Sequence, residues 1–153
     1  MNDAKPHVLI VESRYYEEIA AELLAGATAV LDAAGASYER VEVPGAFEIP
    51  AAVRFAIEAG DGALGPFDGY IGLGCVIRGE TTHYDYVCQE SARGLQDLAL
   101  QYGVAIGYGV LTTDNRDQAW VRADRNEGNK GGTVAEACLA MIALRRRFGL
   151  GRK

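Results

Sequence analysis

Residues 74–86 carry many of the side chains in this sequence that could take part in chemistry. The stretch reads Gly-Cys-Val-Ile-Arg-Gly-Glu-Thr-Thr-His-Tyr-Asp-Tyr and contains His83, the only histidine outside the N-terminal segment. It follows an apolar run, Tyr70–Leu73, typical of a buried strand, and precedes a segment with helical apolar spacing. A strand–loop–helix unit of this kind can bind phosphate, because backbone N–H groups at the start of a helix point towards the anion.

Two nucleotide-binding interpretations of this loop fail. Gly74 and Gly79 have the glycine spacing of a P-loop, but Glu80 occupies the lysine position and would repel phosphate. Gly72 and Gly74 begin a dinucleotide fingerprint whose third glycine is missing. The segment is therefore either a phosphate-binding loop ending in a proton-transferring histidine or an ordinary turn with an exposed imidazole.

Composition narrows the function classes. A formal net charge of −6 argues against nucleic acid or an anionic membrane as partner. We see no signal peptide and no apolar stretch long enough to span a membrane. The three cysteines have neither metal-ligand nor disulfide spacing, so we expect no metal site and a reducing, cytoplasmic location. The 153 residues suit one domain, with residues 1–6 as a disordered tail.

Apolar runs alternate with helical periodicity along the chain. Strands are expected over residues 7–12, 38–43, 69–76 and 104–111, and helices over about 17–34, 50–59, 85–102, 115–121 and 133–148. We expect Ser13, Asn115 and Thr133 to cap three of these helices. The apolar face expected for the last helix is Val134, Ala137, Cys138, Met141, Ile142 and Phe148. This order predicts an α/β three-layer sandwich with a mostly parallel, four- or five-stranded, flavodoxin-like sheet.

The carboxyl ends of parallel strands are where such sheets bind ligands. Four loops meet there in the predicted fold, at residues 13–16, 46–48, 76–83 and 108–115. They supply aromatic rings that could sandwich a flat heterocycle and a carboxylate, Glu48, that could accept hydrogen bonds from hydroxyl groups. Phe47 and Glu48 could instead be a core residue and a helix-start charge. Arg122 and Lys130 flank a glycine-containing break and could reach a phosphate, or could be solvated surface charges.

Four motifs in order and at matching spacing make the sequence similar to the 6,7-dimethyl-8-ribityllumazine synthase family of riboflavin biosynthesis. They are Val43-Pro-Gly-Ala-Phe-Glu-Ile-Pro50, Val76-Ile-Arg-Gly-Glu-Thr-Thr-His-Tyr-Asp-Tyr86, Gly109-Val-Leu-Thr-Thr113 and Gly128-Asn-Lys-Gly131. The resemblance covers roughly residues 7–148. It implies condensation of 5-amino-6-(D-ribitylamino)uracil with L-3,4-dihydroxy-2-butanone 4-phosphate to 6,7-dimethyl-8-ribityllumazine, phosphate and water. The resemblance also implies that no metal or redox cofactor takes part.

The resemblance also implies roles for individual residues. His83 matches the proton-transfer residue, and Tyr15 matches an aromatic residue that stacks on the pyrimidine. The other implied contacts are Ala46, Phe47 and Glu48 with the ribityl chain and ring, the backbones of Val76 and Ile77 with the pyrimidine, the backbone N–H groups of Glu80 and Thr81 with the phosphate, Tyr108 from an adjacent subunit, and Arg122 and Lys130 near the phosphate.

Some positions depart from the common family pattern. Tyr15 stands where phenylalanine is usual, and Glu80 where alanine is frequent; the segment 123–127 differs from capsid-forming members. The family assembles as pentamers or multiples of them, and the sequence does not choose among these assemblies. The alternative function is a non-catalytic lumazine- or flavin-binding or shell-forming paralogue, which would not need His83 or Arg122.

Overall fold

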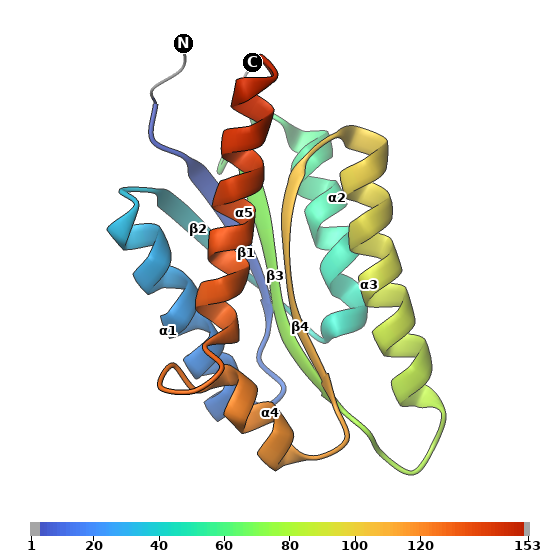
Figure 1. Cartoon of the computed structure of the whole chain (residues 1–153). Coiled ribbons are helices and arrows are strands. Elements are labelled where there is room, and N and C mark those ends of the chain that lie inside the picture. The colour runs from blue at the N-terminus through green and yellow to red at the C-terminus, as the bar shows by residue number, and fades with distance from the viewer. Residues whose placement is uncertain (1–3, 152–153) are drawn as a thin grey trace.

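The computed structural model describes residues 4–151 (Figure 1). Residues 4–6 have no regular secondary structure, and residues 1–3 of the expected tail lie outside the described residues. The elements are β1 (His7–Ser13), α1 (Glu17–Ala33), β2 (Ser37–Val43), a 3-10 turn η1 (Ala46–Glu48), α2 (Ile49–Ala59), β3 (Gly69–Ile77), α3 (His83–Tyr102), β4 (Ala105–Thr113), α4 (Arg116–Ala123) and α5 (Lys130–Arg147).

A four-stranded sheet forms the middle layer. Its strands lie in the order β2-β1-β3-β4, and every pair in the described residues is parallel. This order is the flavodoxin-like arrangement, so the predicted fold class is confirmed with four strands. The parallel register brings the carboxyl ends of β1 and β3 to the same edge, since Glu12 pairs with Leu73.

Helices cover both faces of the sheet. Figure 1 shows α1, α4 and α5 on one face and α2 and α3 on the other. Val8 and Ile10 of β1 pack into the first core, and Leu9 and Val11 pack into the second. A strand that is buried on both faces must be apolar at consecutive positions, which explains the continuous run that begins the sequence. None of the helices in residues 4–151 is long and apolar enough to cross a membrane.

The expected helix starts were right at one position and wrong at two. The Asn115 side chain accepts a hydrogen bond from the backbone N–H of Gln118 at 2.9 Å, so it caps α4 as predicted. Ser13 is the last residue of β1, and Tyr16 takes the capping position of α1. The last helix begins at Lys130 and not at Thr133. Its first turn can include Gly131 because that turn lies directly against α1, where a side chain would not fit.

The buried face of α5 also differs from the predicted one. Val134, Cys138 and Ile142 are buried as expected, whereas Met141 and Phe148 are 46% and 74% exposed, and Ala137 is exposed. Ala135 is buried in place of the larger residues. Because α5 packs closely against both the sheet and α1, small residues are buried along part of its inner face, and Met141 and Phe148 lie outside that contact.

Candidate active site

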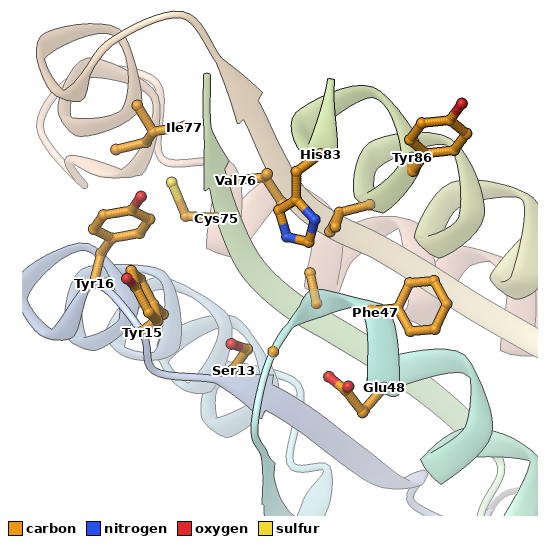
Figure 2. Close-up of a pocket in the computed structure, with 13 residues that line it drawn as sticks. Ser13, Tyr15, Tyr16, Phe47, Glu48, Cys75, Val76, Ile77, His83 and Tyr86 are labelled. Atoms are coloured by element: carbon orange, nitrogen blue, oxygen red, sulfur yellow. The ribbon is translucent and has the colours of Figure 1, made fainter. Parts of the chain in front are cut away.

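A cavity of about 470 Å³ opens at the carboxyl ends of β1 and β3. This volume is within the usual range for a small-molecule site. Figure 2 shows Tyr15 and Tyr16 on one side of the cavity, Phe47 and Glu48 on the other, and His83 between them. The lining residues are Ser13, Tyr15, Tyr16, Gly45, Ala46, Phe47, Glu48, Cys75, Val76, Ile77, His83, Tyr86 and Val87.

The connection from β1 to α1 provides the first aromatic wall. Tyr15 is 77% exposed, and its ring meets the edge of Tyr16 with centroids 4.9 Å apart. Partial burial raises the pKa of Tyr16, so its hydroxyl stays protonated near neutral pH and can donate a hydrogen bond. An exposed ring held against a second ring is suited to stacking on a flat ligand.

The segment between β2 and α2 provides the opposite wall. Gly45 has an extended backbone, and the chain then tightens into η1, which leads directly into α2. Ala46 is buried in the core below and anchors this turn, while Phe47 and Glu48 are exposed towards the cavity. Glu48 is the only carboxylate among the lining residues, and these residues contain no lysine or arginine.

Strand β3 and helix α3 close the cavity. Cys75, Val76 and Ile77 form the end of β3, and His83 is the first residue of α3, so its imidazole lies beside the mouth of the cavity. The backbone N–H of His83 donates to the Thr81 hydroxyl at 3.3 Å. Burial raises the pKa of the Cys75 thiol to about 11, which makes it an unreactive part of the wall near neutral pH.

The loop between β3 and α3 has free backbone donors. Within residues 4–151, no protein group accepts a hydrogen bond from the backbone N–H groups of residues 79–82. Arg78 holds the start of the loop: its Nε donates to Asp114 at 2.9 Å, and its guanidinium lies 4.3 Å from the centroid of the Tyr84 ring. The loop can therefore offer several N–H groups to one anion.

Five predicted site residues are absent from the cavity lining: Glu80 and Thr81, which lie in the loop between β3 and α3, and three residues of other elements. Tyr108 lies in the middle of β4 and faces a separate hollow beside α3. Arg122 lies on α4, where it donates to the carbonyl of Gln118 at 2.9 Å, and Lys130 begins α5 and is exposed. Their contact with substrate stays a prediction, because the sheet and its helices place all three away from the cavity lining.

Comparison with known proteins identifies the family. A family model described as 6,7-dimethyl-8-ribityllumazine synthase matches residues 5–146, which is nearly the whole chain. The chain belongs to the 6,7-dimethyl-8-ribityllumazine synthase family.

Curated lumazine synthases from several bacteria are similar over almost their full length. The chain is 53% identical to 6,7-dimethyl-8-ribityllumazine synthase 1 of Rhizobium meliloti (strain 1021) over 150 residues, which cover 97% of this chain and 98% of the relative. It is 55% identical to the 6,7-dimethyl-8-ribityllumazine synthase of Xanthobacter autotrophicus (strain ATCC BAA-1158 / Py2) over 141 residues, which cover 92% of this chain and 86% of the relative.

The cavity of this lumazine synthase family member contains residues that the sequence did not single out. Cys75 and Val87 were expected only as core or helix residues, and Tyr86 was noted only as part of a motif. Cys75 could have been found from its position, because it directly precedes Val76 and Ile77 at the end of β3. Tyr86 lies one helical turn after His83, a spacing that brings both side chains to the same face of α3.

Proposed function

We propose that the cavity between β1, η1, β3 and α3 is where this lumazine synthase family member binds 5-amino-6-(D-ribitylamino)uracil and condenses it with L-3,4-dihydroxy-2-butanone 4-phosphate. The products are 6,7-dimethyl-8-ribityllumazine, phosphate and water. The observation that carries the proposal is that Tyr15, Phe47, Glu48 and His83 come from three separate segments and line one cavity.

The pyrimidine substrate fits the inner part of the cavity. The exposed Tyr15 ring stacks on the heterocycle, and the backbone of Val76 and Ile77 at the end of β3 contacts its polar edge. Glu48 accepts hydrogen bonds from ribityl hydroxyl groups beside Phe47. These contacts hold the amine nucleophile in place, which supplies much of the rate enhancement for a reaction whose nucleophile is already active.

His83 moves protons in the condensation. It stands at the cavity mouth, between the walls that hold the pyrimidine and the loop with free backbone N–H groups. The imine forms when the substrate amine attacks the ketone and water is lost, phosphate then leaves, and ring closure releases a second water. Each step transfers protons to or from nitrogen and oxygen atoms, which is work for a general acid–base.

The phosphate lies outside the inner cavity, at residues 79–82. The cavity lining carries a carboxylate and no lysine or arginine, so it disfavours a dianion, whereas the loop offers free N–H groups. Arg122 and Lys130 supply the balancing positive charge from a second copy of the chain, because neither lines the cavity in its own subunit. Tyr108 of that second copy closes the site. We therefore propose a homo-oligomer, a pentamer or a multiple of it, acting in the cytoplasm on small-molecule substrates.

The replacement His83→Ala tests the catalytic assignment. We expect kcat to fall by about 10²-fold, with affinity for the ribitylaminouracil unchanged, because positioning survives when proton transfer is lost. The assay mixes both substrates and follows the fluorescence of the lumazine product. His7→Gln is the matched control, since His7 is part-buried at the opposite end of β1, where its ring nitrogens contact Ser37 and Leu64. Wild-type kcat in His83→Ala would refute the role of His83. Tight flavin binding by the wild-type chain without any product would favour the non-catalytic alternative.

A further inference from the structure

A buried carboxylate lies near the carboxyl end of β1, three residues before Tyr15. Glu12, the next-to-last residue of β1, is only 2% exposed and belongs to no assignment made above. Burying a charge is costly unless the charge is paired, and both Glu12 oxygens are paired with arginine. One oxygen accepts from Arg14 at 2.7 Å, and the other lies 2.9 Å and 3.0 Å from two nitrogens of Arg40.

Arg14 links the end of β1 to the start of α1. Three residues, 14–16, connect the strand to the helix. The Arg14 guanidinium contacts Glu12 before this connection and Glu17 after it, the latter at 3.1 Å. The hydrogen bond to Glu12 is the main cause of a raised pKa for Arg14, so the cation persists throughout the ordinary pH range. The guanidinium therefore holds the two ends of the connection together.

The same connection carries Tyr15 into the cavity. The Arg14 side chain turns inward and is 18% exposed, whereas the adjacent Tyr15 points outward and is 77% exposed. Because Arg14 and Tyr15 are adjacent in a connection of only three residues, anchoring Arg14 restricts the backbone that carries Tyr15. The bifurcated, planar guanidinium suits this task because it can bind two carboxylates at fixed angles.

We propose that Glu12 and Arg14 are positioning residues that orient Tyr15 for stacking on the pyrimidine substrate. This inference rests on the proposed function, in which Tyr15 forms the stacking wall. Neither Glu12 nor Arg14 touches the substrate. Their contribution reaches the reaction through the backbone of the β1–α1 connection and concerns the pyrimidine, not the phosphate.

The first test separates the two substrates. In Glu12→Gln, one acceptor oxygen becomes an NH₂ group facing an arginine, so Arg14 loses its anchor or Arg40 does. We expect the KM for the ribitylaminouracil to rise about 5- to 10-fold, with kcat and the KM for the butanone phosphate within about two-fold of wild type. Arg14→Met should raise the same KM at least as much. Arg14→Lys should raise this KM less than Arg14→Met does, because lysine keeps the charge but cannot bridge two carboxylates.

Arg40→Gln is the matched control. It removes a guanidinium from the same carboxylate, but Arg40 lies on β2 and, among the described residues, forms no hydrogen bond or ion pair with residues 14–16. A purely structural role for Glu12 predicts that Arg14→Met and Arg40→Gln lower the melting temperature and alter the KM alike. Positioning predicts that both lower the melting temperature, while only Arg14→Met raises the KM for the pyrimidine. If Glu12→Gln does not fold, the Arg14 variants still test the positioning role, because Glu12 keeps its ion pair with Arg40 in those variants.

A double replacement tests whether the effect passes through Tyr15. Tyr15→Ala alone should raise the pyrimidine KM, and adding Glu12→Gln should then change it by less than about two-fold. If the effects of Glu12→Gln and Tyr15→Ala on the pyrimidine KM multiply in the double variant, the inference is overturned. It is also overturned if Tyr15→Ala raises this KM but Glu12→Gln and Arg14→Met leave it unchanged. If Tyr15→Ala itself leaves the KM unchanged, the pyrimidine wall of the proposed function is wrong, and the positioning role is overturned with it. The two failures are thus distinguishable.

Discussion

Replacing Gly131 with alanine tests the close contact between α1 and α5. A Cβ atom built on Gly131 would lie 2.0 Å from the Leu23 carbonyl oxygen and 2.8 Å from the Leu23 carbonyl carbon. Both obstacles are backbone atoms of α1, which no change of rotamer can move. The two helices must therefore separate by roughly 1 Å or more for the methyl group to fit.

The expected cost follows from this geometry. Overpacking costs about 1–3 kcal/mol, and an obstacle made of backbone places Gly131→Ala at the upper end, near 3 kcal/mol. The gain in helix propensity from glycine to alanine returns at most about 1 kcal/mol. A net loss of about 2 kcal/mol in a chain of this length lowers Tm by roughly 4–8 °C. Parting the helices also displaces Lys130, so the KM for the butanone phosphate should rise.

Gly132→Ala is the control for this measurement. Its added Cβ would lie 2.5 Å from Nδ2 of Asn129, and its nearest neighbours are all atoms of that side chain, which can rotate away. Thermal unfolding of both variants at one protein concentration should show a clearly smaller loss for Gly132→Ala. Equal Tm values for the two variants would contradict the reasoning, because they would mean that the α1 backbone can yield as easily as a side chain.

Three further outcomes are expected. Arg122→Lys should raise the KM for the butanone phosphate, and Arg122→Ala should raise it further, because lysine cannot bind two phosphate oxygens. Inorganic phosphate should compete with the butanone phosphate in the wild-type protein and much less in Arg122→Ala. Equal inhibition of both proteins by phosphate would show that Arg122 is not part of the site. Burial raises the pKa of Cys75 to about 11, so about 10⁻³ of its thiol is ionised at pH 8 and alkylation should be slow there. The rate of alkylation should then rise about tenfold per pH unit until about pH 11. Mass spectrometry should also show that bound ribitylaminouracil protects Cys75, and an unprotected thiol would argue against this cavity. Glu48→Gln should raise the KM for the ribitylaminouracil more than that for the butanone phosphate in steady-state assays, since a neutral amide accepts weaker hydrogen bonds from ribityl hydroxyl groups.

The parts of the fold that depend on local pattern could be predicted from the sequence. Continuous apolar residues gave β1 because that strand is buried on both faces, and Asn115 gave the start of α4 because its cap is made within four residues. The start of α5 could not be predicted in this way. Glycines usually interrupt helices, and only the distant contact with Leu23 explains why Gly131 lies inside one.

The candidate site likewise contains residues that could be predicted from their position in the sequence and residues that could not. Tyr15, Phe47, Glu48 and His83 could be predicted because each lies at the carboxyl end of a strand or the start of the following helix, where a parallel sheet gathers its ligand groups. Arg122 was placed by resemblance alone. Nothing in the sequence near it specifies which cavity it faces, since in the proposed oligomer that depends on how one copy of the chain packs against another.

The cavity lining carries one carboxylate and no lysine or arginine, which has a consequence for the kinetics of the proposed two-substrate reaction. Glu48 stands among aromatic and aliphatic side chains, and no lysine or arginine lines the cavity to offset its charge. In the proposed site, the butanone phosphate, with close to two negative charges at neutral pH, should be repelled from the position of the uncharged pyrimidine. We therefore expect that an excess of the butanone phosphate forms no dead-end complex in the cavity and leaves it open for the pyrimidine.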